Sequence, residues 1–226
     1  MDKLNQELDA FGARFGTNRL VDLAINQRAN AVILEKVHNA VNEDKLEKWL
    51  ASPPDMKQKQ RETEKTRKEG TGRWFFERAE FVEWQDNAGS LWIEGPSGAG
   101  KSVLSSAVIS KLVEDKKLFR DVNKPPPPPA VAFFYFDFRT KETQSVESAL
   151  RRIILQLSAQ SPYPYKDLDE HYSLSKGQTL PTIKDLHHIL QRLLQQLRRT
   201  YIILDALDEC ASEDIGWRVK ATECSA

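Results

Sequence analysis

The sequence predicts an α/β fold, an incomplete parallel sheet flanked by helices, with an N-terminal helical segment before it. Three observations lead to this prediction. Short apolar runs alternate with segments whose apolar residues recur every three or four positions, as strands and covering helices do in parallel sheets. The run Ala130–Phe136 has no polar alternation, which is typical of a strand buried on both faces. A glycine-rich loop, GPSGAGKS, joins the apolar run Leu91–Ile93 to a helical pattern.

The composition is that of an ordinary soluble chain. It has 226 residues, a formal net charge of +0 and 29% charged residues, so its charge favours binding neither to nucleic acid nor to an acidic membrane. The N-terminus lacks the apolar core of a secretory signal, and no apolar run could span a bilayer. Cys210 and Cys224 are too few for a disulfide framework or a cysteine-built metal site. We therefore expect a cytoplasmic protein.

Three regions are expected along the chain. Residues 1–55 form an N-terminal helical segment, with a helix over 18–50 that ends before Pro53. Its apolar stripe indicates packing on a neighbour, with oligomerisation or binding of a signalling partner as the alternative. Residues 56–69 are almost wholly polar, as in a linker or a solvated helix, and their basic residues offer a phosphate-binding role as an alternative. Residues 70–226 form the sheet-containing domain.

The elements of this domain follow from local patterns. Aromatic residues within 74–84 predict a short packed helix, Leu91–Ile93 the first strand, and residues 103–112 a helix with one apolar face. The prolines at 125–129 predict a stiff polyproline II spacer before the buried strand Ala130–Phe136. An SH3-type ligand is the alternative interpretation of the spacer.

Two further helices and a strand are predicted beyond that point. The helices cover residues 150–157 and 186–197, and Thr182 and Asp185 are a capping pair before the second one. Residues 201–204 form another apolar strand. A brief alternation at residues 215–221 indicates a short strand that Gly216 weakens.

The glycine-rich loop matches the phosphate-binding pattern G-x-x-x-x-G-K-[ST] at every fixed position. Its residues are Gly95, Pro96, Ser97, Gly98, Ala99, Gly100, Lys101 and Ser102. Glycines let the backbone N–H groups approach an anion, and the positive end of the next helix adds to the site. Lys101 would reach the β- and γ-phosphates, and the Ser102 hydroxyl would bind Mg²⁺. We expect ATP or ADP as the nucleotide, since no guanine-specific N-K-x-D motif occurs.

The strand YIIL leads into DALDE, which supplies acids for a metal site. Asp205 has the position of a Walker B aspartate, at the carboxyl end of a strand. Asp208 and Glu209 are the expected catalytic acids, which either polarise the attacking water or contact Mg²⁺ through water. Ala206 stands where many ATPases have a catalytic glutamate, so we expect slow or negligible hydrolysis, a weak nucleoside triphosphatase at most.

With both motifs placed, the chain resembles the fungal NACHT-type STAND proteins, which are P-loop NTPases related to the NOD-like receptors. The stretches that carry the resemblance are WLASPPD, EGTGRWFFERAEFVEW, LWIEGPSGAGKSVLSS with FFYFDF, and YIILDALDEC, within residues 49–210. The D-x-x-D-E spacing in the last stretch is the most specific to the family. The resemblance implies that Thr71 and Gly72 lie near the adenine and ribose, with Trp74 packed close by.

The family consists of nucleotide-controlled switches that are closed with ADP and oligomerise with ATP, in fungi often for non-self recognition or cell death. The resemblance therefore implies a homo-oligomer or a signalling partner. It also implies a five-stranded sheet in which the strand after YIIL lies between YIIL and the loop strand. Because the sequence stops soon after YIILDALDEC, we expect an incomplete sheet with partly exposed strands and weak cooperativity.

Two other functions are compatible with the sequence. An active P-loop ATPase or small-molecule kinase would need an acceptor pocket and a lid with arginines, for which Arg151 and Arg152 are candidates. A non-enzymatic interaction module would act through the N-terminal helix. Phosphate-release assays with and without acceptors test the first alternative, and a pull-down with residues 1–55 tests the second.

Overall fold

A computed structural model describes two long stretches of the chain, residues 39–118 and 129–211. It also describes four isolated helical positions, Gln27, Asn30, Leu34 and Val37. Three features considered in the sequence fall outside the described residues: the strand at 215–221, Cys224, and the proline run as far as Pro128.

The chain divides into two compact units, Met1–Asp44 and Lys45–Ala226. Every described position of the first unit is helical, in agreement with the helix predicted over 18–50. Three apolar positions of its predicted stripe, Leu34, Val37 and Val41, are exposed. The sheet, its covering helices and the candidate site all belong to the second unit. Within the described stretches, no helix is both long and apolar enough to cross a bilayer.

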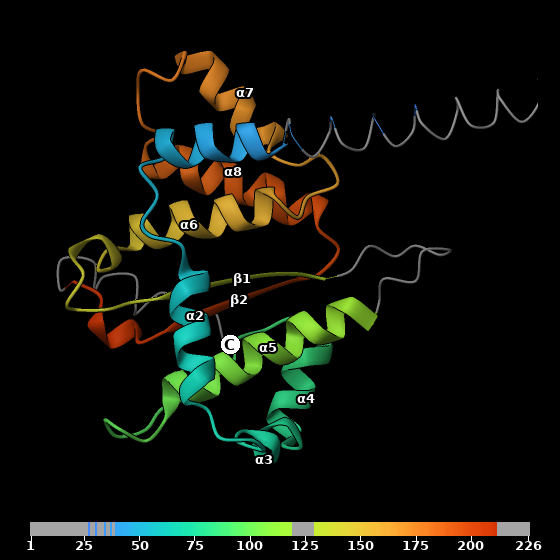
Figure 1. Ribbon diagram of the computed structural model, residues 1–226, viewed down its shortest axis with the longest axis vertical. Helices are drawn as coiled ribbons and strands as arrows, with labels where there is room; N and C mark the ends of the chain where they lie inside the picture. The colour runs from blue at the N-terminus through green and yellow to red at the C-terminus, as the bar shows by residue number, and fades with distance from the viewer. Residues whose placement is uncertain are drawn as a thin grey trace, which may run out of the picture. The chain divides into compact units, whose positions relative to one another are not determined.

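Two parallel strands form the centre of the second unit (Figure 1). β1 (Ala130–Tyr135) pairs with β2 (Thr200–Asp205), in a register that runs from Ala130↔Thr200 to Tyr135↔Asp205. All residues of β1 are buried, as its continuous apolar run predicts. The parallel pairing and the alternating helices confirm the predicted α/β class.

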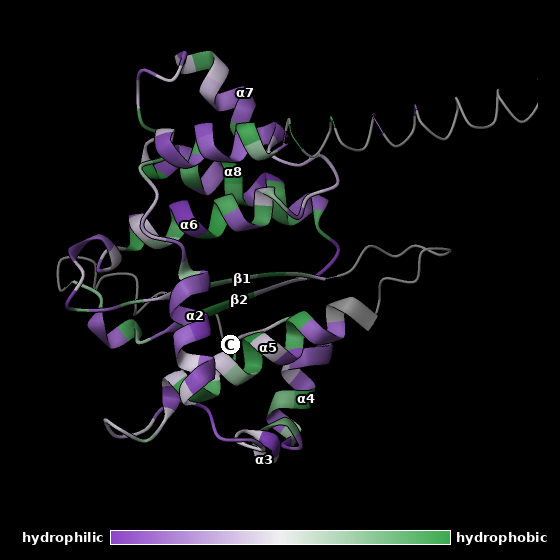
Figure 2. Cartoon of the chain, viewed as in Figure 1, coloured by the Kyte–Doolittle hydropathy of each residue, from purple (hydrophilic) through white to green (hydrophobic). Residues whose placement is uncertain are grey.

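Helices cover both faces of the sheet (Figure 1). One side carries α6 (Val146–Ser158), α7 (Lys166–Ser175) and α8 (Ile183–Gln196). The other side carries α3 (Arg73–Phe76), α4 (Ala79–Asp86) and α5 (Lys101–Leu118). Because side chains alternate along a strand, Ala130 and Ala132 pack in the core with α6 and α8, whereas Val131 packs with α4 and α5. The middle of each strand is hydrophobic (Figure 2), in the runs Val131–Phe134 and Ile202–Leu204.

The core on the α6 side also includes the chain just before the two prolines. Residues 39–49 are helical, and Leu46 and Leu50 are completely buried among residues that include Ile154 and Leu186. At the start of α8, Thr182 and Asp185 form the predicted capping box. The end of the first helix before Pro53 and the start of α8 at Thr182 therefore follow from signals in the sequence.

Side chains occupy the outer edge of β1, on the side away from β2. Gln156 accepts a hydrogen bond from the Phe133 N–H (3.2 Å) and donates one to the Phe133 carbonyl (2.9 Å). Gln160 does the same with Val131, at 3.1 and 2.9 Å. The Tyr135 backbone N–H donates to the sulfur of Met56, with 3.5 Å between the nitrogen and the sulfur. These groups satisfy the backbone polar atoms that a further strand would otherwise use.

The predicted first strand, Leu91–Ile93, is not a strand in the structure. Residues 90–96 have no regular conformation, and Trp92 is 58% exposed. A strand exists only by pairing, and β2 has no second neighbour among the described residues. The strand that the resemblance places between Leu91–Ile93 and β2 would have to come from sequence beyond residue 211, which the structure does not describe.

Three other segments refine the sequence reading. Residues expected to be a polar linker or a solvated helix form α2 (Met56–Thr66), which is largely hydrophilic (Figure 2) but buries Met56 and Gln60. The aromatic segment at 74–84 forms two helices, α3 and α4, rather than one. The sequence reading missed α7, whose buried residues are only Asp167 and Leu168. Two short 3-10 helices complete the described elements, η1 (Lys141–Thr143) and η2 (Leu207–Glu209).

Candidate functional site

The glycine-rich loop leads directly into α5, whose first residue is Lys101. The Lys101 ammonium group donates to the carbonyl oxygens of Gly95 (2.7 Å) and Pro96 (3.2 Å). Gly98 and Gly100 have φ values of +79° and +88°, a left-handed region in which a side chain would be strained. The backbone conformation itself therefore requires glycine at Gly98 and at Gly100, the second fixed glycine of the pattern.

The loop ends at the N-terminus of a long helix. Because α5 has 18 residues, its first turn presents unpaired backbone N–H groups and the positive end of a helix dipole. This arrangement suits an anion such as phosphate.

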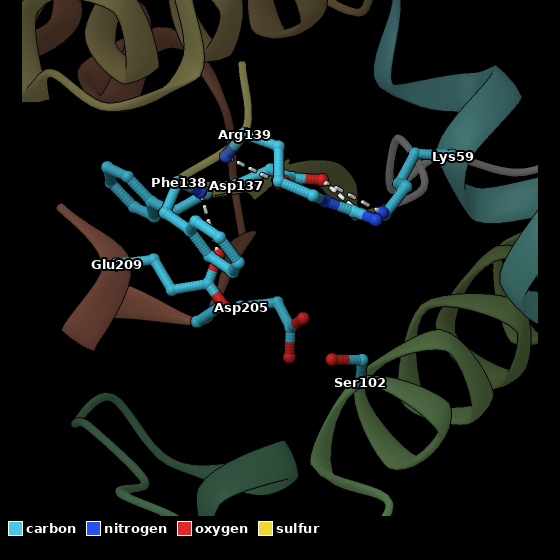
Figure 3. A pocket seen from close by; sticks show the side chains of 9 residues that line it. Lys59, Ser102, Asp137, Phe138, Arg139, Asp205 and Glu209 are labelled. Carbon is cyan, nitrogen blue, oxygen red and sulfur yellow. Dashed lines mark hydrogen bonds and ion pairs between the residues drawn. The ribbon is translucent and has the colours of Figure 1, made fainter. Parts of the chain in front are cut away.

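A cavity of about 250 Å³ lies where the start of α5 meets the ends of the two strands (Figure 3). Its polar lining consists of Lys59, Ser102, Asp137, Arg139, Asp205 and Glu209. Ligand pockets usually measure roughly 300–1,000 Å³, so this cavity suits phosphate groups and a metal ion rather than a whole nucleotide. A base and ribose would lie outside it.

The cavity brings together the two residues predicted to bind a metal. Asp205, the last residue of β2, is only 5% exposed and accepts a hydrogen bond from the Ser105 hydroxyl at 2.8 Å. In Figure 3 its carboxylate and the Ser102 hydroxyl point toward each other. Since Ser102 and Ser105 are three residues apart on α5, one face of the helix positions both hydroxyls at the end of β2.

The donor set of this pair fits Mg²⁺. Carboxylate and hydroxyl oxygens are hard ligands, and Mg²⁺ is commonly held by one or two protein groups together with phosphate oxygens and water. In the part of the chain that the structure describes, no group of three His, Cys, Asp or Glu side chains could hold a metal. A metal ion at Ser102 and Asp205 would therefore need oxygens from a ligand or from water.

The two predicted catalytic acids differ in position. Glu209 lines the cavity and accepts a hydrogen bond from the Phe138 backbone N–H at 2.9 Å. Asp208 is exposed and is not part of the lining. Ala206 has a left-handed φ of +54° and turns the chain into η2. Of the two acids, Glu209 is therefore the one that the fold places at the cavity.

Thr71 and Gly72 lie away from the cavity lining, at the start of α3. Gly72 is buried with φ +91°, and a Cβ atom there would lie 3.2 Å from the Ala107 Cβ on α5. Close packing of α3 on α5 thus explains this glycine. Thr71 is exposed, and Trp74 is 60% exposed. Their expected place beside an adenine and a ribose stays a prediction.

Three charged residues of the cavity were not singled out in the sequence. Asp137, two residues after β1, accepts hydrogen bonds from Arg139 Nε (2.9 Å) and Nη2 (2.7 Å), and its other cation is Lys59 at 3.3 Å. Hydrogen bonds from the Arg139 side chain hold the pKa of the Asp137 carboxyl well below its usual range, against the effect of desolvation. The Arg139 backbone N–H and Lys59 lower this pKa further. Asp137 is therefore a carboxylate at neutral pH.

A signal for these residues is present in the sequence. Ligands of parallel sheets bind at the carboxyl ends of the strands, and Asp137 and Arg139 directly follow the predicted strand Ala130–Phe136. Lys59 belongs to the basic segment for which a phosphate-binding role was an alternative. No pattern within α2 distinguishes Lys59 from its exposed neighbour Lys57.

Comparison with known proteins gives two matches. The model of a family described as "Nephrocystin 3, N-terminal" matches residues 70–223, more than half of the chain. Vegetative incompatibility protein HET-E-1 of Podospora anserina is 29% identical over 149 residues, which cover 62% of this chain and 10% of that protein. The chain thus spans about a tenth of the length of this curated relative. No solved structure matches the chain.

Proposed function

Because the chain belongs to the nephrocystin 3 N-terminal family, whose matched range, residues 70–223, contains both the glycine-rich loop and Asp205, we propose that it is a nucleotide-binding signalling module of the NACHT/STAND type. It binds ADP and ATP together with Mg²⁺, and it hydrolyses ATP slowly or not at all. It signals through which nucleotide is bound, ADP or ATP, and not through the rate of hydrolysis.

One observation carries the proposal. The Ser102 hydroxyl, at the end of a complete phosphate-binding loop, faces a buried carboxylate, Asp205, across a cavity of phosphate size. The two residues are 103 positions apart, by the difference of their numbers, and their approach at one cavity is the arrangement expected of Mg²⁺ ligands in a P-loop protein.

The slow-hydrolysis part of the proposal rests on the residues after β2. Ala206 cannot act as a base, and Glu209 already accepts a hydrogen bond from Phe138. Slow turnover suits a switch, because the bound nucleotide then persists long enough to define a state.

The likeness to HET-E-1 supports a signalling role. The name of that protein refers to vegetative incompatibility, which is a form of fungal non-self recognition. We propose a role of the same kind for this chain, with a homo-oligomer or a signalling partner contacted through the N-terminal helix.

Calorimetry with Mg²⁺-ADP and Mg²⁺-ATP tests nucleotide binding. Lys101→Ala should weaken binding by about tenfold or more, because hydrogen bonds to charged groups contribute about 1.5–3 kcal/mol. Lys57→Ala is the matched control, since Lys57 is an exposed lysine on α2 that does not line the cavity. Wild-type protein that binds neither nucleotide, or equal affinities for wild type and Lys101→Ala, would refute the proposal.

A further inference from the structure

Arg139 and Lys59 place two positive groups at the cavity. Both pair with the Asp137 carboxylate, Arg139 through a two-point contact at 2.9 and 2.7 Å and Lys59 at 3.3 Å. Figure 3 shows the guanidinium and ammonium groups beside Asp137, with the Asp205–Ser102 pair on the other side of the cavity. A phosphate bound beside a metal ion at Ser102 and Asp205 would therefore also face the cations Arg139 and Lys59.

The three members of this cluster differ in how tightly they are held. The Arg139 side chain is 67% exposed, whereas that of Asp137 is 16% exposed. The backbone between them is fixed, because the Phe138 N–H donates to Glu209. A rearrangement in the cluster would therefore be a rotation of the Arg139 side chain, with Lys59 left as the partner of Asp137.

A terminal phosphate is a better partner for Arg139 than Asp137 is. A phosphate group carries about −1.5 to −2 charges and three strong acceptor oxygens, against the single charge and two oxygens of a carboxylate. The planar fork of arginine matches phosphate geometry at two points. Charge favours the exchange, and the exposed position of Arg139 lets it occur without moving the backbone.

The position of the Asp137–Arg139–Lys59 cluster favours contact with the γ-phosphate rather than with the β-phosphate. In P-loop proteins the loop lysine and the metal ion hold the β- and γ-phosphates, and the metal bridges their oxygens. With a metal ion at Ser102 and Asp205, a β-phosphate would lie on the loop side, and a γ-phosphate would be the group nearer to Asp137, Arg139 and Lys59 (Figure 3). A diphosphate would lack the group that contacts Arg139.

We propose that Arg139 is the residue that distinguishes ATP from ADP: it rests on Asp137 in the diphosphate state and moves to the γ-phosphate in the triphosphate state. This inference rests on the proposed function and adds a regulatory residue to the same site. Because the Arg139–Asp137 contact breaks only with a triphosphate, the Arg139 side chain has a different position in each of the two states.

Calorimetry with Mg²⁺-ADP and with a non-hydrolysable β,γ-imido analogue of ATP tests the inference on the full chain. Arg139→Ala should weaken binding of the triphosphate analogue about tenfold or more, because it removes a charged hydrogen-bonding partner. It should change the ADP affinity less than about threefold. Arg139→Lys keeps the charge but loses the planar two-point donor, so its affinity for the triphosphate analogue should lie between those of wild type and Arg139→Ala. Lys57→Ala, an exposed cation outside the cavity, should change neither affinity.

The outcomes separate this inference from the proposed function. Wild-type protein that binds neither nucleotide would refute the proposed function. Wild-type protein that binds both, with Arg139→Ala affecting both equally or neither, would overturn the inference and leave the proposed function standing. A thermal melt of Arg139→Ala that matches wild type shows that the fold is intact, as expected for an exposed side chain.

Asp137→Asn tests the exchange itself. Removing the carboxylate charge weakens the contact between Arg139 and residue 137. Affinity for the triphosphate analogue should therefore rise by about threefold or more, which corresponds to the free energy of about one surface ion pair. A fall in that affinity comparable to that of Arg139→Ala would show that Asp137 holds Arg139 in its binding position, and would overturn the exchange.

Discussion

The glutamine side chains on the outer edge of β1 allow a prediction whose size follows from the structure. Gln156→Ala removes two hydrogen bonds to the Phe133 backbone, at 3.2 and 2.9 Å. Phe133 is only 8% exposed, so water replaces these bonds poorly. At about 0.5–1.5 kcal/mol per bond, the free energy of unfolding should fall by about 1–3 kcal/mol. This is a large share of the roughly 5–15 kcal/mol that a typical domain has.

Urea unfolding followed by circular dichroism measures the effect. With a slope of about 2 kcal/mol per molar urea, a loss of about 2 kcal/mol lowers the midpoint by about 1 M. Gln160→Ala removes the equivalent pair of bonds to Val131, so the double variant should lose about twice as much. A matched control is Gln191→Ala, which makes the same change at an exposed position of α8.

The control separates edge bonding from helix propensity. Gln156 and Gln191 both lie within helices, and alanine is the better helix former at either position. Gln191→Ala should therefore leave the midpoint unchanged or raise it slightly. If Gln156→Ala had the same midpoint as this control, the carboxamide would not hold the edge of β1, and the reasoning would be refuted.

Four further predictions concern the site and the helix caps. Asp205→Asn should remove most of the Mg²⁺ dependence of nucleotide binding while keeping the fold, because it replaces an anionic ligand by a neutral one of similar shape; an unchanged response to Mg²⁺ in calorimetry would contradict the metal role. Phosphate release should stay below about 1 s⁻¹, the lower end of typical turnover, and tens per second would favour the ATPase alternative. Gly98→Ala should cost about 1–3 kcal/mol in urea unfolding and weaken nucleotide binding, since φ there is +79°; a wild-type midpoint would show that the loop relaxes. Hydrogen bonds from the Thr182 side chain and backbone lower the pKa of Asp185 in the folded protein. The stability that the Asp185 carboxylate adds is therefore present above about pH 4, the unfolded pKa, and is lost as the pH falls through the lower pKa of the folded state. Melting temperatures of wild type and Asp185→Asn should differ at neutral pH and converge in strong acid.

The elements that the sequence predicted correctly are those whose signal lies within one segment. In α8, Leu186, Ile189 and Leu193 recur at helical spacing and are buried, and the cap at Thr182 fixes where the helix starts. In β1, the continuous apolar run corresponds to burial on both faces. Such local patterns need no knowledge of the rest of the fold.

The elements that failed depend on neighbours or on unsignalled backbone turns. Leu91–Ile93 is apolar enough for a strand, but apolarity does not supply a pairing partner. The helix α7 is flanked by the cap residues Tyr165 and Lys176, both in left-handed conformation. Neither residue type favours that conformation. Gly177, which follows Lys176 and has φ +68°, is a boundary signal only for the end of the helix.

The candidate site divides in the same way. Ser102 and Asp205 belong to motifs, and each could be assigned from the residues beside it. Lys59 and Asp137 are 78 residues apart, and their pairing at the cavity depends on how α2 packs beside β1. A contact of this kind follows from the assembled fold and from no local pattern.

The alignment of the two strands determines whether the cavity can exist at all. Tyr135 lies opposite Asp205, so both strands end at the same level, and Asp137 continues from one strand beside the last residue of the other. A slip of one residue would turn every side chain of β2 to the opposite face and take the Asp205 carboxylate away from Ser102. A misaligned sheet would still be compact, helical and largely buried, yet unable to bind its ligand. Ligand binding therefore reports the fraction of molecules in the correct register, which circular dichroism alone does not distinguish.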